Sequence, residues 1–171
     1  YAFVIIPLLE WRLKQPNTIY SDQEIEGRLK NKLFDLMLYF NVPIVFGLLS
    51  YGLLTLHQDV FATYERVGIL SSLGILLATN AINVAHELGH RLSRFERTLS
   101  KLLYMPCLYM HFFLEHNYGH HKNLATSDDP ATARYNQPLY SFWISSVINQ
   151  YKNAWKIQFR LLSGKQKSFF S

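Results

Sequence analysis

Apolar residues form long blocks along this chain of 171 residues, and the charged residues gather between the blocks. Residues 33–56 contain one charge, Asp35, and at 1.5 Å per residue they would form a helix about 36 Å long. Residues 67–85 contain no charge. Both stretches are long enough to cross a bilayer, so they predict a transmembrane hairpin joined by the polar link 57–66. The apolar residues 1–9 predict the end of another membrane helix.

The polar and interrupted segments predict helices outside the bilayer core. Within the polar residues 10–32, Ser21 and Glu24 have the spacing of a capping box, which predicts the start of a short surface helix. Residues 99–115 are apolar but contain Pro106. We expect them to form a re-entrant or interfacial helix rather than a span.

The last third of the chain predicts a loop and one amphipathic helix. Residues 123–138 contain two turn signals, each with a proline. Residues 139–162 alternate between an apolar and a basic face, which is typical of a helix lying on a membrane surface. The whole pattern predicts an all-α, polytopic membrane protein, with residues 1–171 as a single partial membrane domain and residues 99–134 as its histidine-rich region. The aromatic and basic residues that suit the membrane surface are Trp143, Trp155, Lys152, Lys156 and Arg160.

The distribution of charge predicts the orientation of the hairpin. The net charge is +5, but the basic residues flank the apolar blocks and form no single patch, which argues against nucleic-acid binding. Segment 57–66 has one Arg and two acids, whereas 10–32 and 91–101 are rich in Lys and Arg. The positive-inside rule places 57–66 outside and both basic segments in the cytoplasm. Helix 67–85 therefore runs inward and brings its C-terminal end to the cytoplasmic face.

The cysteine count and the two ends of the sequence exclude some classes of protein and suggest a partial domain. The single Cys107 excludes an intramolecular disulfide and a cysteine-rich zinc module. The chain begins within an apolar run without an initiator Met or a signal peptide, and it stops at Ser171 without a helix-ending signal. We expect it to be part of a longer catalytic domain.

Five of the seven histidines fall into two boxes, H-E-L-G-H at 86–90 and H-N-Y-G-H-H at 116–121. His86 and His90 are four residues apart on the continuation of a predicted span, so their rings face the same way. In an α-helix His116 and His120 would also lie only about 40° apart, and His121 would lie about 100° further round, at the edge. Polar groups are costly at the end of a membrane helix, so this grouping predicts a metal site.

The two remaining histidines are not expected to bind the metal, and the boxes themselves leave several metals open. His57 lies in the predicted outer loop, and His111 would point about 140° away from His116. The first box also matches the H-E-x-x-H motif of zinc proteases, with Glu87 as general base. The second box argues against that function, because five histidines exceed one tetrahedral zinc site with an open position. Imidazole ligands suit iron, copper or zinc, and their place at the membrane favours oxygen chemistry on an apolar substrate.

The two boxes and the residues after them resemble the membrane alkane 1-monooxygenases, within the wider membrane desaturase and hydroxylase superfamily. The resemblance covers essentially the whole chain. It is most specific in E-H-N-Y-G-H-H at 115–121, Ala125-Thr126 and D-P-A-T-A-R at 129–134, and it includes P-L-L-E at 7–10. It implies a piece of a six-helix membrane hydroxylase in a bacterial inner membrane, with the histidine boxes at the cytoplasmic face.

The resemblance also implies an activity. The family uses O2 to hydroxylate the terminal carbon of medium- or long-chain alkanes at two histidine-bound irons, with electrons from rubredoxin and rubredoxin reductase. A related fatty-acid or alkyl-aromatic hydroxylase or desaturase is the alternative. Carried onto this chain, the iron ligands would be His86, His90, His116, His120 and His121.

The resemblance further implies that this ligand set is incomplete, since the family has additional histidines in later motifs. We therefore expect residues 1–171 alone to be inactive. Glu87, Glu115 and Asp129 are the acids expected to orient ligand imidazoles. An apolar substrate would enter between membrane helices, where Gly47, Gly52 and Gly74 are expected to leave room.

Overall fold

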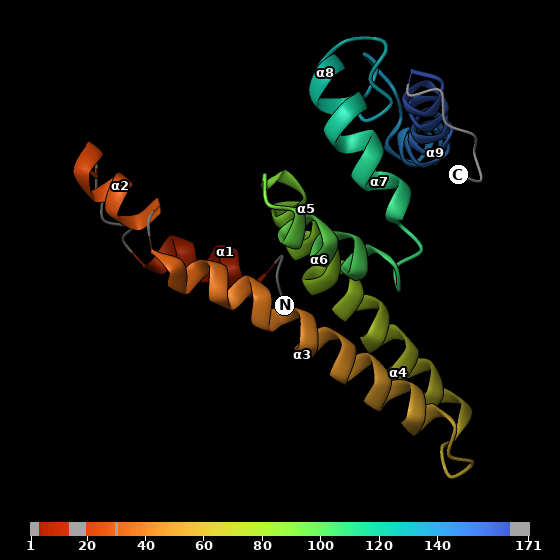
Figure 1. The fold of residues 1–171 in the computed structure, drawn as a ribbon. Helices are drawn as coiled ribbons and strands as arrows, with labels where there is room; N and C mark the ends of the chain where they lie inside the picture. The colour runs from red at the N-terminus through yellow and green to blue at the C-terminus, as the bar shows by residue number, and fades with distance from the viewer. Residues whose placement is uncertain (1–3, 14–19, 30, 165–171) are drawn as a thin grey trace. The chain divides into compact units, whose positions relative to one another are not determined.

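A computed structural model describes residues 4–13, 20–29 and 31–164 of the chain. Within these ranges every regular element is a helix (Figure 1). The chain divides into two units, residues 1–35 and 36–171, which are described separately. The first unit contains α1 (Ile5–Arg12), α2 (Asp22–Leu29) and the start of α3 (Lys32–Leu56).

The sequence of α2 explains where this helix begins. The backbone N–H of Ser21 donates to Glu24 Oε2 at 2.9 Å, and the N–H of Glu24 donates to Ser21 Oγ at 3.4 Å. These two bonds satisfy amide groups that the first helical turn leaves without a partner. The predicted capping box is confirmed.

Two helical runs are long and apolar enough to cross a membrane, judged by length and composition. One contains α3, and the other runs from Thr63 to His90 through α4 (Thr63–Leu76), η1 (Leu77–Ala81) and α5 (Ile82–His90). They correspond to the apolar segments 33–56 and 67–85. The second run begins four residues before the apolar block because Glu65 accepts from the N–H of Ala62 at 2.8 Å and caps the helix there.

The second run contains a π-helical turn, η1, that the apolar pattern did not predict. In a π-helix each N–H bonds the carbonyl five residues earlier, as Ile82 does with Leu77. A side chain of α3 also donates a hydrogen bond to this turn. Asn41 Nδ2 of α3 donates to Asn80 O at 3.3 Å, so a polar contact joins the two runs at this turn.

Glycines in these helices do not all leave space between them. A Cβ at Gly52 would lie 2.7 Å from Leu73 Cδ2, so the side chain of Leu73 packs directly on the Gly52 backbone. The expectation that Gly52 leaves room for a substrate is therefore wrong, because Leu73 fills the space. Gly47 and Gly74 have no such neighbour within 4 Å among the described residues.

The predicted single helix at 99–115 is instead two helices, α6 (Arg94–Tyr104) and α7 (Met110–Glu115). The intervening residues include Pro106, which has no N–H to continue a helix, and Leu108, whose φ of 52° is left-handed. This turn reverses the direction of the chain. The prediction of a single helix over 99–115 is wrong for this reason, while its re-entrant or interfacial location stays a prediction.

Helix α6 packs on α5, and this contact positions the end of the second run. Ser100 Oγ donates to Ala85 O at 2.6 Å, and both residues are fully buried. Gly89 lies beside them, since a Cβ there would be only 3.1 Å from Ser100 Oγ. Around this contact a core forms from Val45, Ala81, Ala85, Leu88, Leu103, Tyr104 and Phe113.

Replacing Ser100 with alanine should destabilise the α5–α6 pair by about 1 kcal/mol, because it removes a buried hydrogen bond to a backbone carbonyl. The free energy of unfolding in detergent would measure the loss. Thr98→Ala is the matched control, since the bond that Thr98 makes among the described residues is within its own helix, to Arg94 O. An equal loss in the two variants would contradict the role assigned to Ser100.

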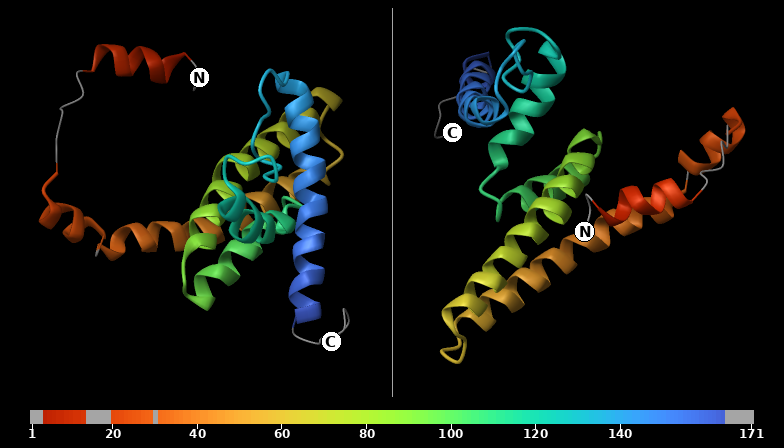
Figure 2. Two further views of the ribbon diagram at one scale, coloured as in Figure 1. Left: turned by 90° about the horizontal axis from the view of Figure 1, so that it is seen from above. Right: turned by 180° about the vertical axis from the view of Figure 1, so that it is seen from behind.

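After α7 the chain forms the second π-helical turn, η2 (His116–His120), then α8 (His121–Asn123) and a loop at 124–138. The last helix, α9 (Leu139–Gly164), corresponds to the predicted amphipathic segment 139–162. It packs against α7 and η2 (Figure 2). Its buried residues are Ser146, Gln150, Ala154 and Ile157.

Candidate metal centre

The first histidine box lies at the end of α5, where regular α-helical spacing holds. His86 and His90 are one turn apart, and their Nε2 atoms are 2.9 Å apart. The helix ends directly afterwards, since Arg91 has an extended backbone. The prediction that one helix would present both rings to the same point is confirmed.

The second box departs from regular α-helical spacing. The N–H of His121 bonds the carbonyl of His116, five residues earlier, so the turn from His116 to His120 is π-helical. A wider turn places residue i+5, rather than i+4, over residue i. His121 Nε2 accordingly lies 3.1 Å from His116 Nε2. The His120 ring stacks on the His116 ring, with centroids 5.2 Å apart and planes 20° apart. The expectation that His116 and His120 would share one face is confirmed, whereas His121 lies closer to His116 than α-helical spacing predicted.

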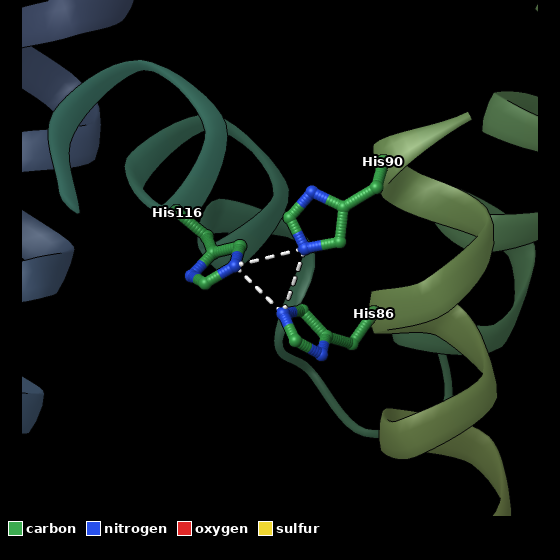
Figure 3. A group of neighbouring side chains, drawn as sticks. All are labelled: His86, His90 and His116. Atoms are coloured by element: carbon green, nitrogen blue, oxygen red, sulfur yellow. Dashed lines mark hydrogen bonds between the residues drawn. The ribbon is translucent and has the colours of Figure 1, made fainter. Parts of the chain in front are cut away.

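The two boxes meet at His116. Its Nε2 is 2.7 Å from His86 Nε2 and 3.2 Å from His90 Nε2, so three ring nitrogens from two separate segments form a triangle (Figure 3). His121 extends the group through its contact with His116. The ring nitrogens of His86 and His116 thus meet although the two residues are 30 positions apart in sequence.

The triangle fits a metal ion. Imidazole nitrogens lie about 2.0–2.1 Å from a bound metal, so neighbouring ligand nitrogens are roughly 3 Å apart. The observed separations are close to that value. A neutral imidazole carries only one N–H, so three facing nitrogens cannot all satisfy one another by hydrogen bonds. A cation would satisfy three lone pairs at once.

The environment of His116 keeps its ring neutral. Burial and then the neighbouring His86, His121 and His90 lower the pKa of His116 to about 3. The lone pair of a neutral ring is free to bind a metal. Phe112 stacks on this ring, with centroids 4.9 Å apart and planes 16° apart, and shields one of its faces.

His120 is held by a carboxylate instead of by another histidine. Its Nδ1 lies 2.9 Å from Asp129 Oδ2, and the side chain of Asp129 is fully buried. Burial alone would raise the pKa of Asp129, but bonds from the Thr132 hydroxyl, the Ala131 N–H and His120 lower it overall. An anionic carboxylate on Nδ1 fixes the proton there and leaves His120 Nε2 with a lone pair for a metal.

The other two acids expected to orient ligand rings make different contacts. Glu87 is exposed and accepts from Arg91 Nη2 at 3.0 Å. Glu115 is fully buried, and its Oε1 accepts from Asn153 Nδ2 of α9 at 3.1 Å. Burial raises the pKa of Glu115. Of the three acids, Asp129 is the one for which the described residues show a bond to a ring of the two boxes.

Gly119 makes the contact between η2 and α9 possible. A Cβ at this position would lie 2.7 Å from Asn153 Nδ2 and 2.8 Å from Glu115 Oε1, the two atoms that share the hydrogen bond. Only a residue without a side chain allows the buried carboxylate and its amide partner to remain against the π-turn.

Gly119→Ala is expected to separate Asn153 from Glu115 and to lower metal occupancy, because His120 and His121 lie on the turn that would shift. Metal content and melting temperature of the purified variant are the measurements. Gly47→Ala is the control: a Cβ there meets nothing within 4 Å, so higher helix propensity should leave stability unchanged or raised. If Gly119→Ala had the same metal content and melting temperature as Gly47→Ala, close packing at Gly119 would have no part in holding the metal ligands in place.

The remaining histidines lie apart from the cluster. His111 packs between Tyr109 and Tyr151, with ring centroids 4.7 and 5.1 Å away, and His57 is exposed in the loop after α3. Both positions agree with the prediction that neither histidine belongs to the metal cluster. Sequence reasoning missed Thr132 and Asn153. Thr132 had a local signal, because a threonine three residues after an aspartate often bonds back to it, whereas Asn153 had none.

Comparison with known proteins identifies the class to which this fold and site belong. Residues 65–170 match the fatty acid desaturase family. The chain therefore belongs to that family, and it is a membrane protein whose described residues form only helices and bring three histidines together at one candidate metal site. The family assignment made from the histidine boxes is confirmed.

Its more similar relatives include alkane monooxygenases. It is 30% identical to alkane 1-monooxygenase 1 of Alcanivorax borkumensis and 30% identical to alkane 1-monooxygenase of Pseudomonas putida, in both cases over 98% of this chain. It is 31% identical, over 78% of its length, to the xylene/toluene monooxygenase hydroxylase component XylM of Pseudomonas putida, of which it covers 37%. The chain spans 41% of the length of the first two relatives.

Proposed function

We propose that this protein is an alkane 1-monooxygenase, which hydroxylates the terminal carbon of medium- or long-chain alkanes. The observation that supports it is the convergence of His86, His90 and His116 within 2.7–3.2 Å, in a chain whose relatives are named alkane monooxygenases. A cluster built only of imidazoles, at the end of an apolar helix, suits a metal that meets an apolar substrate.

The proposed cofactor is a pair of non-haem irons, with O2 as co-substrate. Their ligands in this chain would be His86, His90, His116, His120 and His121. Bound iron would supply the activation of O2. Five imidazoles leave two irons short of a full ligand set, so residues 1–171 alone are proposed to be inactive.

The protein's own side chains prepare the site. His116 offers a neutral ring because burial and neighbouring imidazoles keep its pKa low. Asp129 holds the His120 proton on Nδ1. Phe112 covers the face of His116 and excludes water from that side. These groups hold the ligands, while the substrate would contribute only apolar contacts.

The proposed reaction is balanced by an external reductant. One alkane, one O2, two electrons and two protons give one 1-alkanol and one water. The electrons would come from rubredoxin, reduced by rubredoxin reductase. The proposed location is the bacterial inner membrane, crossed several times, with the metal site on the cytoplasmic side where rubredoxin is accessible.

A second candidate substrate class is favoured by the similarity to XylM, whose name assigns it to xylene and toluene. A methyl group on an aromatic ring and the end of an alkane present the same kind of C–H bond. Membranes containing the full-length protein, supplied with reduced rubredoxin, should convert octane faster than toluene if the alkane proposal is correct. Faster conversion of toluene would favour the alkyl-aromatic function.

Metal analysis tests the cofactor separately. The purified protein should contain iron and no stoichiometric zinc. One equivalent of zinc, with proteolysis that is lost in Glu87→Gln, would instead support the H-E-x-x-H protease function.

A further inference from the structure

Helix α9 has three distinct faces, and one of them is buried against the rest of the described chain. Outside this buried face, Tyr151 also contacts the ring of His111. Ser146, Gln150, Ala154 and Ile157 are at most 7% exposed and face α7 and η2. These positions recur at three- and four-residue spacing, so they form one stripe. The polar and small character of this stripe is unusual, because an amphipathic helix normally buries its apolar face.

The large apolar side chains of α9 lie on an exposed face. Their spacing of three and four residues places them together on one side of the helix. They include Trp143 and Trp155, at 55% and 38% exposure. The other members of this apolar face are Tyr140, Ile144, Val147, Ile148, Tyr151 and Phe159, which are 47–72% exposed. So much contiguous apolar surface marks an interaction site.

A row of cations borders the apolar face. Lys152, Lys156 and Arg160 are four residues apart, so they follow the same side of the helix. All three are exposed, and none forms an ion pair within residues 31–164. Beyond them is a polar pocket of about 540 Å³ lined by Lys152, Lys156 and Arg134, together with the acids Asp128 and Asp129. Asp129 is already bonded to His120 and Thr132.

An apolar groove continues the exposed face on its other border. It has a volume of about 590 Å³ and lies between α7 and α9. Tyr151 and Trp155 belong both to the groove and to the apolar face, and Leu108, Met110 and Leu114 line the opposite wall. An apolar groove of this size suits a hydrocarbon chain.

The direction of α9 fits a location in the plane of a membrane. Figure 1 looks nearly along the axis of α9, whereas α4 runs across the same picture, and Figure 2 shows α9 along its length. The two helices belong to the same unit. If α4 and its continuation cross the bilayer, α9 runs crosswise to them and therefore along the surface.

We infer that α9 binds the anionic lipid surface of the membrane. Its apolar face enters the headgroup region, Tyr151 and Trp155 contact acyl chains, and Lys152, Lys156 and Arg160 bind acidic headgroups. Tyr and Trp favour this depth because their rings are amphipathic, and basic residues along such a helix attract anionic lipid. The inference does not depend on the proposed reaction, since it requires only that α9 meet the bilayer.

The arrangement has a consequence for the metal site. The buried face of α9 also carries Asn153, which bonds Glu115, the residue directly before His116. Binding of α9 to lipid would therefore fix the depth of the second histidine box relative to the membrane surface.

Photocrosslinking tests this inference in the whole protein. Benzoylphenylalanine replaces Tyr151 in one variant and Tyr135, a 95% exposed tyrosine of the 124–138 loop, in the control. Each variant is placed in nanodiscs of equal parts phosphatidylglycerol and phosphatidylcholine, and the adducts are identified by mass spectrometry. We expect lipid adducts at 151, enriched in phosphatidylglycerol, and a much lower lipid yield at 135. Absence of lipid adducts at 151, or adducts there to a second copy of the protein in place of lipid, would overturn the inference.

The basic row is tested in the same nanodiscs. A triple variant with Lys152, Lys156 and Arg160 each changed to Gln keeps the apolar face and should still crosslink lipid at 151. Each basic residue near an anionic surface contributes about fivefold in binding, so phosphatidylglycerol enrichment should fall at least fivefold. The role of the cations would be overturned if the protein with all three basic residues showed no phosphatidylglycerol enrichment. It would also be overturned if the triple variant showed the same enrichment as that protein.

Discussion

Replacing His116 with alanine is expected to abolish metal binding and hydroxylation together. His116 is the one ring whose Nε2 lies within 3.2 Å of those of His86, His90 and His121, so its loss separates the two boxes. Loss of a residue that merely orients a ligand costs about 10–100-fold, and loss of a central ligand should cost at least that upper value. Iron per protein and the rate of octane oxidation are the measurements.

The control for this variant lies on the same stretch of chain. His111→Ala removes an imidazole five residues earlier that packs against Tyr109 and Tyr151 and lies outside the cluster. It should lower stability, because it leaves a gap among aromatic rings, while iron content per folded protein stays unchanged. Equal iron loss in both variants would mean that His116 acts through folding and not as a ligand.

Asp129→Ala is expected to lower metal affinity or activity by about 10–100-fold without unfolding the protein. The substitution removes the acceptor for His120 Nδ1, so the ring can rotate and its proton can move to Nε2, where it blocks a metal. Asp129→Asn, which keeps the size and one acceptor oxygen, should lose less. Titration of the metal-free protein with Fe²⁺ compares the two variants.

Asp128→Ala provides the matched control, since Asp128 is the adjacent acid and is exposed. It changes the net charge equally but has no bond to a ring of the boxes among the described residues. Its Fe²⁺ affinity should equal that of the parent. A similar loss at both positions would show that loop charge, rather than the bond to His120, sets the affinity.

The sequence predicted those features that depend on local pattern. The capping box at Ser21 and the pairing of His86 with His90 follow from spacing along an α-helix, and both are present. The apolar blocks coincide with the two long helical runs. In each case the information lies within a few residues, so no knowledge of distant contacts was needed.

The second box shows where such reasoning fails. A π-turn widens the helical repeat, and it brings His121 to His116 although the His120 ring also stacks on the His116 ring. This turn is stabilised by groups far away in sequence, since Asn153 of α9 bonds Glu115 beneath Gly119. Spacing at about 100° per residue carries no information on that contact.

Two other differences between the predicted and the observed structure also result from contacts between distant residues or from an unusual backbone conformation. Leu73 fills the space above Gly52 because α3 and α4 meet there, although no residue near Gly52 in sequence indicates it. The split of 99–115 was signalled by Pro106, but the left-handed Leu108 that completes the turn was not. Leucine rarely adopts that conformation, so its occurrence at position 108 could not be expected from the residue type.

The proposed role of the histidine cluster is an O2-dependent hydroxylation, and the source of the oxygen atom in the product distinguishes it from other reactions. Membranes containing the full-length protein are supplied with octane, reduced rubredoxin and ¹⁸O2 in ordinary water. We expect 1-octanol carrying one ¹⁸O atom, and no labelled alcohol in the His116→Ala variant. Unlabelled 1-octanol, or equal labelled product from the variant, would contradict this role.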